Sequence, residues 1–108
     1  MKFRKMLFYV TAERKRPFLD WLMDLDIQVR GRIEARLDRM AGGNAGDYRA
    51  VGEGVFEMRL HFGPGYRVYY AYDGQEFVLL LLAGDKSSQP SDIKKAKFFW
   101  QDYQRRKE

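Results

Sequence analysis

The chain has 108 residues, no cysteine and a formal net charge of +5, from 20 lysines and arginines against 15 acidic residues. This length predicts a single domain over residues 1–108. The absence of cysteine excludes disulfides and thiolate metal sites, and no apolar run approaches the roughly 20 residues of a membrane-spanning helix. No segment has the pattern of a signal peptide, so we expect a cytoplasmic protein. The positive charge favours a polyanionic or acidic partner.

The first half of the chain predicts one strand and two helices. The apolar run 6–11 is short and rich in β-branched and aromatic residues, which is typical of a buried strand. Two stretches with the apolar spacing of a helix follow. Asp26 lies between them and can cap the second helix, which should end at Gly42-Gly43. Their apolar residues are Phe18, Trp21, Leu22 and Leu25 in the first helix and Val29, Ile33, Leu37 and Met40 in the second. A basic stripe of Arg32, Arg36 and Arg39 lies beside the second, and we expect it to face solvent.

The second half predicts three strands and a last helix. Residues 43–54 are rich in Gly, Asn and Asp and are expected to form a loop. Strands are expected at 55–62, 66–72 and 77–83, and the third is so apolar that both of its faces should be covered. A helix should run from about 90 to 107, capped by Ser91 or Asp92. The order β-α-α-β-β-β-α predicts an α+β fold, with a helical hairpin packed on a largely antiparallel four-stranded sheet.

The predicted strand 55–62 carries the residues that could take part in a chemical reaction. Its apolar side chains alternate with Glu57, Arg59 and His61, which should therefore share an exposed face. Arg67 begins the next strand, and Lys86 follows the last one. Either could join the same face, depending on the register of the strands.

This set could cleave RNA without a metal or another cofactor. Attack by the 2′-hydroxyl needs a base, cations that stabilise the transition state and an acid that protonates the leaving 5′-oxygen. Glu57 or His61 could be the base, and His61 or Lys86 could be the acid. Arg59 and Arg67 could hold phosphate oxygens.

A simpler interpretation of the same residues also stands. Polar residues that alternate with apolar ones are the ordinary solvent face of a sheet, and Glu57, Arg59 and Arg67 could form cross-strand salt bridges. His61 is the only histidine, so a pair of histidines cannot act as acid and base. No glycine-rich phosphate loop and no metal-ligand spacing is present.

Three motifs favour a functional site over an ordinary solvent-exposed face, because together they resemble those of a known family. They are G-V-F-E-M-R-L at 54–60, G-P-G-Y-R-V-Y-Y at 63–70 and L-L-L-A-G-D-K-S-S-Q at 80–89. With them the chain resembles the phage-related addiction module killer protein branch of the RelE/HigB toxin superfamily. The resemblance implies the compact RelE/ParE toxin-like α+β fold.

The resemblance also implies a function. The chain would be the toxin of a type II toxin–antitoxin module, an endoribonuclease (mRNA interferase) that cleaves mRNA on the ribosome. Arg67 would be the transition-state clamp, Lys86 a second cation, Glu57 the base and Arg59 an assisting residue. The implied partner is an antitoxin, usually a helix-turn-helix protein encoded beside the toxin.

The chain departs from the family in one respect. Some relatives carry a catalytic His or Tyr near the C-terminus, whereas this chain has no histidine there, and Tyr103 cannot be equated with that group. The general acid is therefore unassigned. Two alternatives remain: a toxin that acts by binding, as gyrase poisons do, and a catalytically degenerate module that binds only its antitoxin.

Overall fold

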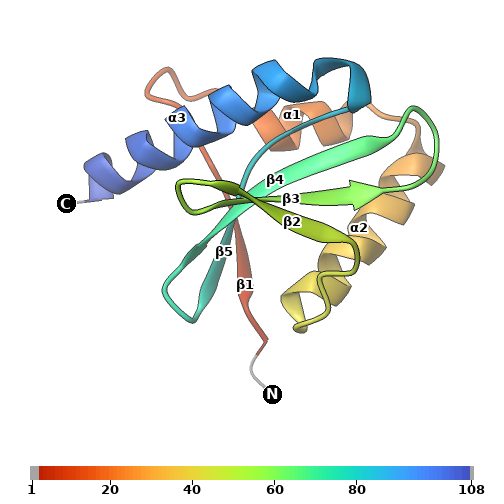
Figure 1. Cartoon of the computed structure of the whole chain (residues 1–108), viewed down its shortest axis with the longest axis horizontal. Coiled ribbons are helices and arrows are strands. Elements are labelled where there is room, and N and C mark those ends of the chain that lie inside the picture. The colour runs from red at the N-terminus through yellow and green to blue at the C-terminus, as the bar shows by residue number, and fades with distance from the viewer. Residues whose placement is uncertain (1–2, 108) are drawn as a thin grey trace.

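A computed structural model describes residues 3–107, so residues 1–2 and 108 of the predicted domain lie outside the described part. The elements lie in the order β-α-α-β-β-β-β-α (Figure 1). They are β1 (Lys5–Phe8), α1 (Pro17–Met23), α2 (Ile27–Ala41), β2 (Tyr48–Gly52), β3 (Val55–Leu60), β4 (Tyr66–Asp73), β5 (Phe77–Gly84), a 3-10 turn (Lys86–Ser88) and α3 (Gln89–Lys107). The strands form one sheet in the order β1-β5-β4-β3-β2. The predicted α+β class is confirmed.

The predicted four-stranded sheet is corrected in two details. The expected loop 43–54 contains β2, an edge strand that pairs antiparallel with β3 and turns back through Glu53 and Gly54, both of which have positive φ. β1 pairs parallel with β5, so the sheet is mixed. The outer edge of β5 would otherwise present unpaired N–H and C=O groups, and β1 satisfies them.

Helices cover both faces of the sheet. On one face α1 and α2 contribute residues such as Phe18 and Ile33 to a core with Met58 and Leu80. On the other face α3 contributes Ala96, which packs with Tyr69, Leu79 and Leu81. The prediction that 77–83 is covered on both faces is therefore confirmed, since alternate residues of β5 enter the two cores.

Local capping explains where α2 and α3 begin. The Asp26 side chain accepts a hydrogen bond from the Gln28 amide at 3.0 Å, so the predicted cap of α2 is confirmed. α3 begins earlier than expected, at Gln89, because Asp85 caps the preceding 3-10 turn and the two helices run on without a break. Asp92 is therefore buried in the first turn of α3, where it accepts a hydrogen bond from Ser88 Oγ at 2.5 Å. No helix within residues 3–107 is both long and apolar enough to cross a membrane.

Candidate functional site

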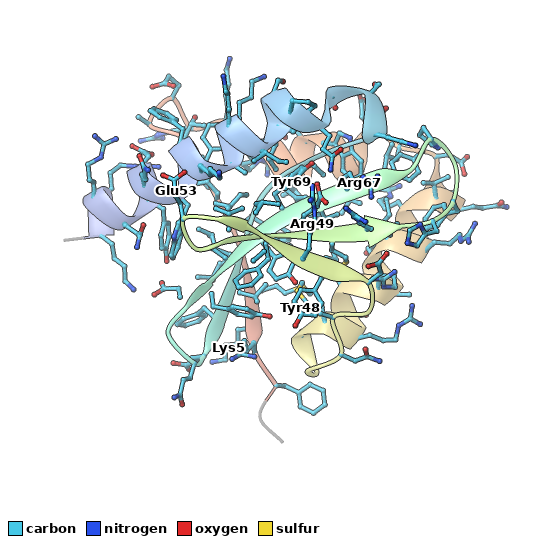
Figure 2. All side chains as sticks on the ribbon, in the orientation of Figure 1. Lys5, Tyr48, Arg49, Glu53, Arg67 and Tyr69 are labelled. Carbon is cyan, nitrogen blue, oxygen red and sulfur yellow. The ribbon has the colours of Figure 1, made fainter. Side chains whose placement is uncertain are left out.

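The register of the middle strands gathers charged side chains on one face of the sheet. Arg59 lies directly opposite Arg67 on β4, and Glu57 lies opposite Tyr69. Arg49, on β2, lies opposite Glu57 from the other side. Figure 2 shows Arg49, Arg67 and Tyr69 together over the middle of the sheet, beside the start of α3. We call Arg49, Arg59 and Arg67 the arginine cluster.

Glu57 is the centre of this cluster, and it is fully buried, with an exposed fraction of 0%. Its Oε1 accepts hydrogen bonds from Arg49 Nε at 3.0 Å and from Arg59 Nε at 3.2 Å. Its Oε2 accepts hydrogen bonds from Tyr69 Oη at 3.1 Å and from Gln89 Nε2 at 2.7 Å. The prediction that Glu57 lies on an exposed face is wrong, because α3 covers this face. Gln89, the first residue of α3, contacts the buried carboxylate through its side chain.

The same contacts decide the protonation of Glu57. Burial alone would raise the pKa of its carboxyl group, but the hydrogen bonds from Gln89, Arg49, Arg59 and Tyr69 outweigh burial and hold the pKa below its usual value. Both oxygens are occupied, and the group is ionised at neutral pH. Glu57 thus orients two arginines and is poorly placed to take a proton from a substrate.

Arg67 is the member of the cluster that lacks a counter-ion. The ion pairs of the cluster join Glu57 to Arg49 and Arg59, and among residues 3–107 Arg67 has none. Its Nε is buried and has no hydrogen-bond partner. Like charges opposite each other on paired strands repel, so Arg59 beside Arg67 is unfavourable unless an anion lies between them. Within the described residues, Glu57 thus neutralises part of the positive charge of Arg49 and Arg59, and the charge of Arg67 has no such partner.

Lys86 lies at the same end of β4 as Arg67. Gly84 is the partner of Arg67 on β5, and Lys86 follows it two residues later. A Cβ atom built on Gly65 would lie 3.5 Å from the Cβ of Lys86, so the 3-10 turn packs against the start of β4. The Asp85 side chain fixes this turn by accepting a hydrogen bond from the Ser87 amide at 2.8 Å. The exposed Lys86 is thus placed near the cluster, and its role stays a prediction.

His61 lies apart from the cluster. Its exposed imidazole lies in hydrogen-bond contact with the Asp47 carboxylate, and this contact lowers the pKa of the Asp47 carboxyl group. It borders α2 rather than the arginine cluster. Within the described residues, no side-chain contact joins His61 to Glu57, Arg59 or Arg67.

Sequence reasoning missed three residues of this site. Arg49 fell in the expected loop, so no sheet face could be assigned to it. Tyr69 could have been found, because it follows Arg67 by two residues on a predicted strand and must share its face. Gln89 reaches Glu57 only through the placement of α3, which the local pattern does not give. No group of three or more histidine and acidic residues in the described ranges could hold a metal ion.

The fold and the site define a class: a small basic α+β domain whose sheet carries a cationic cluster suited to an anionic ligand. The chain belongs to the family of phage-derived, Gp49-like proteins, whose model matches residues 20–98. This family is one of candidate addiction-module killer proteins, in keeping with a toxin role. The chain is also similar to a protein of Haemophilus influenzae (strain ATCC 51907 / DSM 11121 / KW20 / Rd) that is described only as uncharacterized. The two are 43% identical over 86 residues, which cover 79% of this chain and 87% of the relative.

Proposed function

We propose that this protein is the toxin of a type II toxin–antitoxin module, of the RelE/HigB type, and that it cleaves mRNA on the ribosome. Membership of the Gp49-like family supports the toxin role. The observation that carries the nuclease proposal is the state of Arg67. Among residues 3–107 its guanidinium has no counter-ion and its buried Nε has no partner, and it lies opposite a second arginine. A phosphate between Arg59 and Arg67 would relieve their repulsion and accept hydrogen bonds from both.

The proposed cleavage consumes no co-reactant, because the nucleophile is the 2′-oxygen of the RNA itself. The 2′-oxygen loses its proton to a base and attacks the adjacent phosphorus, and a 2′,3′-cyclic phosphate forms. The bond to the 5′-oxygen breaks, and an acid donates a proton to that oxygen. Charge on the phosphoryl oxygens grows in the transition state, where preorganised guanidinium groups stabilise it most.

The residues take different roles in this proposal. Arg67 and Arg59 hold the phosphate, and Glu57 positions Arg59 through its hydrogen bond. Lys86, in the turn that packs beside the start of β4, is the candidate acid. Glu57 is a weak candidate for the base, because both of its oxygens are occupied. His61 could act only if the RNA extends past Asp47 toward α2.

The test compares Arg67→Ala with Arg67→Lys and with Arg105→Ala, which removes an exposed arginine from α3. Each variant is expressed without an antitoxin, growth is followed, and the 5′ ends of cellular mRNA are mapped. We expect Arg67→Ala to abolish growth arrest and to slow cleavage of ribosome-bound mRNA about 10²–10³-fold, the usual cost of losing one transition-state donor. Arg67→Lys should recover part of the rate, and Arg105→Ala should match the unmodified protein.

Three results would overturn the nuclease proposal. Full cleavage by Arg67→Ala would show that Arg67 is not the clamp. Growth arrest with intact mRNA and signs of DNA damage would indicate a toxin that acts by binding, as gyrase poisons do. Harmless expression of the unmodified protein would indicate a catalytically degenerate module.

An antitoxin is the partner that this function requires. We propose that it covers the arginine cluster with acidic side chains, because complementary charge there speeds association and blocks access of RNA. A helix-turn-helix protein encoded next to this chain would fit. Loss of binding to that protein in a variant with the cluster arginines replaced would support the proposal.

A further inference from the structure

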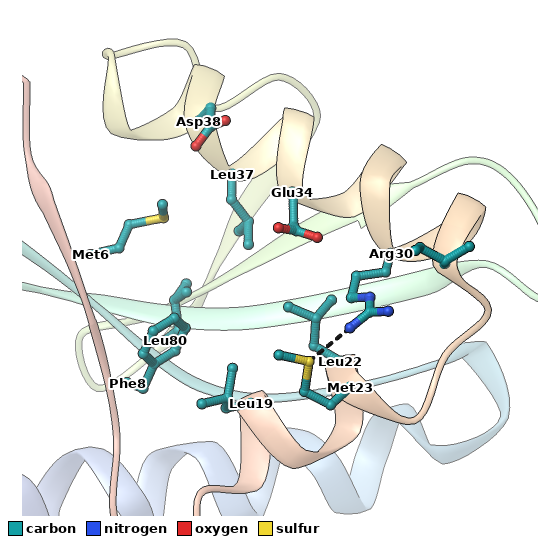
Figure 3. Close-up of a pocket in the computed structure, with 11 residues that line it drawn as sticks. Met6, Phe8, Leu19, Leu22, Met23, Arg30, Glu34, Leu37, Asp38 and Leu80 are labelled. Atoms are coloured by element: carbon teal, nitrogen blue, oxygen red, sulfur yellow. Dashed lines mark hydrogen bonds between the residues drawn. The ribbon is translucent and has the colours of Figure 1, made fainter.

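Helix α2 separates its charges onto two sides. On one side Arg30, Glu34 and Asp38 border a largely apolar pocket between α1, α2 and β1, as Figure 3 shows. On the other side Arg32, Arg36 and Arg39 line a groove of about 420 Å³ with His61 and Phe62, which follow β3. Among residues 3–107, none of the groove's lining residues is acidic, and one carboxylate, Asp47, lies beside it in contact with His61. We call this second groove the α2 groove.

Two of the three arginines of the α2 groove are held in place. Arg36 donates hydrogen bonds to the carbonyl oxygens of Ala45 at 3.1 Å and Arg59 at 3.3 Å. Gly46 has φ +65, and a Cβ atom there would lie 2.5 Å from Arg36 Nη2, so a glycine is needed for this close approach. The Arg32 guanidinium lies over the Phe62 ring, 3.8 Å from its centroid. Such stacking fixes the plane of the guanidinium and leaves its N–H groups free to bind an anion.

The α2 groove and the arginine cluster lie on opposite faces of the sheet, and the groove reaches the end of β3, where Arg59 lies. Arg36 bonds to the backbone of Arg59, the residue that lies opposite Arg67. The three arginines of α2 occupy positions i, i+4 and i+7, so they spread along roughly 10 Å of one helix side. A flexible ligand with anionic groups repeated along its length could reach both sets of guanidinium groups by passing around the end of β3.

We propose that the α2 groove binds the phosphodiester backbone of single-stranded RNA that passes around the end of β3 from the phosphate held by Arg67. The proposal deepens the proposed function and takes its RNA ligand from it. RNA fits better than an isolated anion, because the guanidinium groups are spaced along a line instead of converging on one point. Planar guanidinium groups also match phosphate oxygens in a bidentate geometry. Binding here would fix which nucleotides flank the cleaved bond.

The test measures binding of a single-stranded RNA of about 12 nucleotides, with methylated 2′-oxygens to prevent cleavage, by fluorescence anisotropy over a range of salt concentrations. The test variant is the double substitution Arg32→Ala/Arg39→Ala, since both residues are exposed and Arg36 also supports the fold. The matched control is Lys94→Ala/Lys95→Ala, which removes two exposed charges from α3. Thermal melts of both variants check that the fold is intact.

We expect the control to bind like the unmodified protein. The test variant should bind more weakly, and the slope of log K against log salt should fall by about 1.4, because each lost phosphate contact on a single strand contributes about 0.7. An equal slope for the unmodified protein and the test variant would overturn the proposal. The proposal would also be overturned if the test variant bound RNA normally but no longer bound polyglutamate. The groove would then bind an acidic protein segment.

The test separates this proposal from the nuclease proposal. RNA binding that depends on Arg32 and Arg39, in a protein that cleaves no mRNA, would support the groove and refute the nuclease. Cleavage that depends on Arg67, together with RNA binding that does not depend on Arg32 and Arg39, would support the nuclease and refute the groove.

Discussion

Replacing Glu57 by glutamine is the sharpest test of how the arginine cluster is built. The carboxylate is fully buried and accepts four hydrogen bonds, two of them from arginines. The amide of Glu57→Gln has nearly the same shape, so no cavity forms. It has no charge, however, and its NH₂ group would face donors on whichever side it lies. The substitution therefore removes electrostatics and leaves packing almost unchanged.

The magnitude follows from the contacts. Hydrogen bonds to a charged group contribute about 1.5–3 kcal/mol each. The side chains of Arg49 and Arg59 are 48% and 32% exposed, so water can replace part of what they lose. We expect a total loss of about 3 kcal/mol in the free energy of unfolding, or a fall in Tm of roughly 10–20 °C for a domain of this size.

The dependence of stability on pH predicts the direction in which the effect of Glu57→Gln should change. The pKa of the Glu57 carboxyl group is lowered in the folded protein from its ordinary value of 4.5. Its contribution to stability is therefore complete above that value and is lost as the pH falls through the lowered pKa. Denaturant melts at neutral pH and at about pH 3 should show the advantage of the unmodified protein over Glu57→Gln shrinking in acid.

A matched variant is Tyr69→Phe, which removes one donor from Oε2 while Gln89 still binds that atom. It should cost about 1–2 kcal/mol, less than Glu57→Gln. Our account of Glu57 would be refuted if Glu57→Gln melted within a degree or two of the unmodified protein, or if its deficit stayed the same in acid.

Three further substitutions probe the rest of the fold. Gly84→Ala would place a Cβ atom against Asp92 Oδ2 and Ser88 Oγ, so denaturant melts should show a loss of about 1–3 kcal/mol. Gly31→Ala, in α2 with no atom within 4 Å of the new Cβ, should instead gain about 0.5–1 kcal/mol, and a loss there would contradict the helix geometry. Burial and the hydrogen bond to Asp102 raise the pKa of Tyr9 to about 12. Tyr9→Phe should therefore leave the tyrosinate absorbance recorded up to about pH 11 unchanged, and a smaller signal would contradict it.

The sequence predicted those elements whose pattern is local. The helical stripes of α1 and α2 and the alternation of Phe56 and Met58 with Glu57 and Arg59 depend only on spacing along the chain, and the structure has them. β2 was missed because its side chains are mostly exposed and it lies beside glycine-rich segments. The parallel pairing of β1 with β5 joins residues at opposite ends of the chain, such as Leu7 and Leu79, and spacing carries no information about it.

The site was predictable to a similar extent. Alternation placed Glu57 and Arg59 on one face, and Arg67 could join them only in a register that the sequence does not fix. The structure has that register, with Arg59 and Arg67 opposite each other. The burial of Glu57 was not predictable, because it depends on a helix that begins 32 positions later, at Gln89. His61 was grouped with Glu57 by the same alternation, but the strand ends at Leu60, and beyond it the alternation no longer fixes direction.

The bond between Gln89 and Glu57 has a consequence for synthesis of the protein. Gln89 is the first residue of the last helix, so the ribosome has translated most of the chain before Glu57 gains this contact. β1, made first, must likewise wait for β5 before its edge is paired. The nascent chain thus acquires the geometry of its arginine cluster only near the end of translation, and a prematurely terminated chain would lack it.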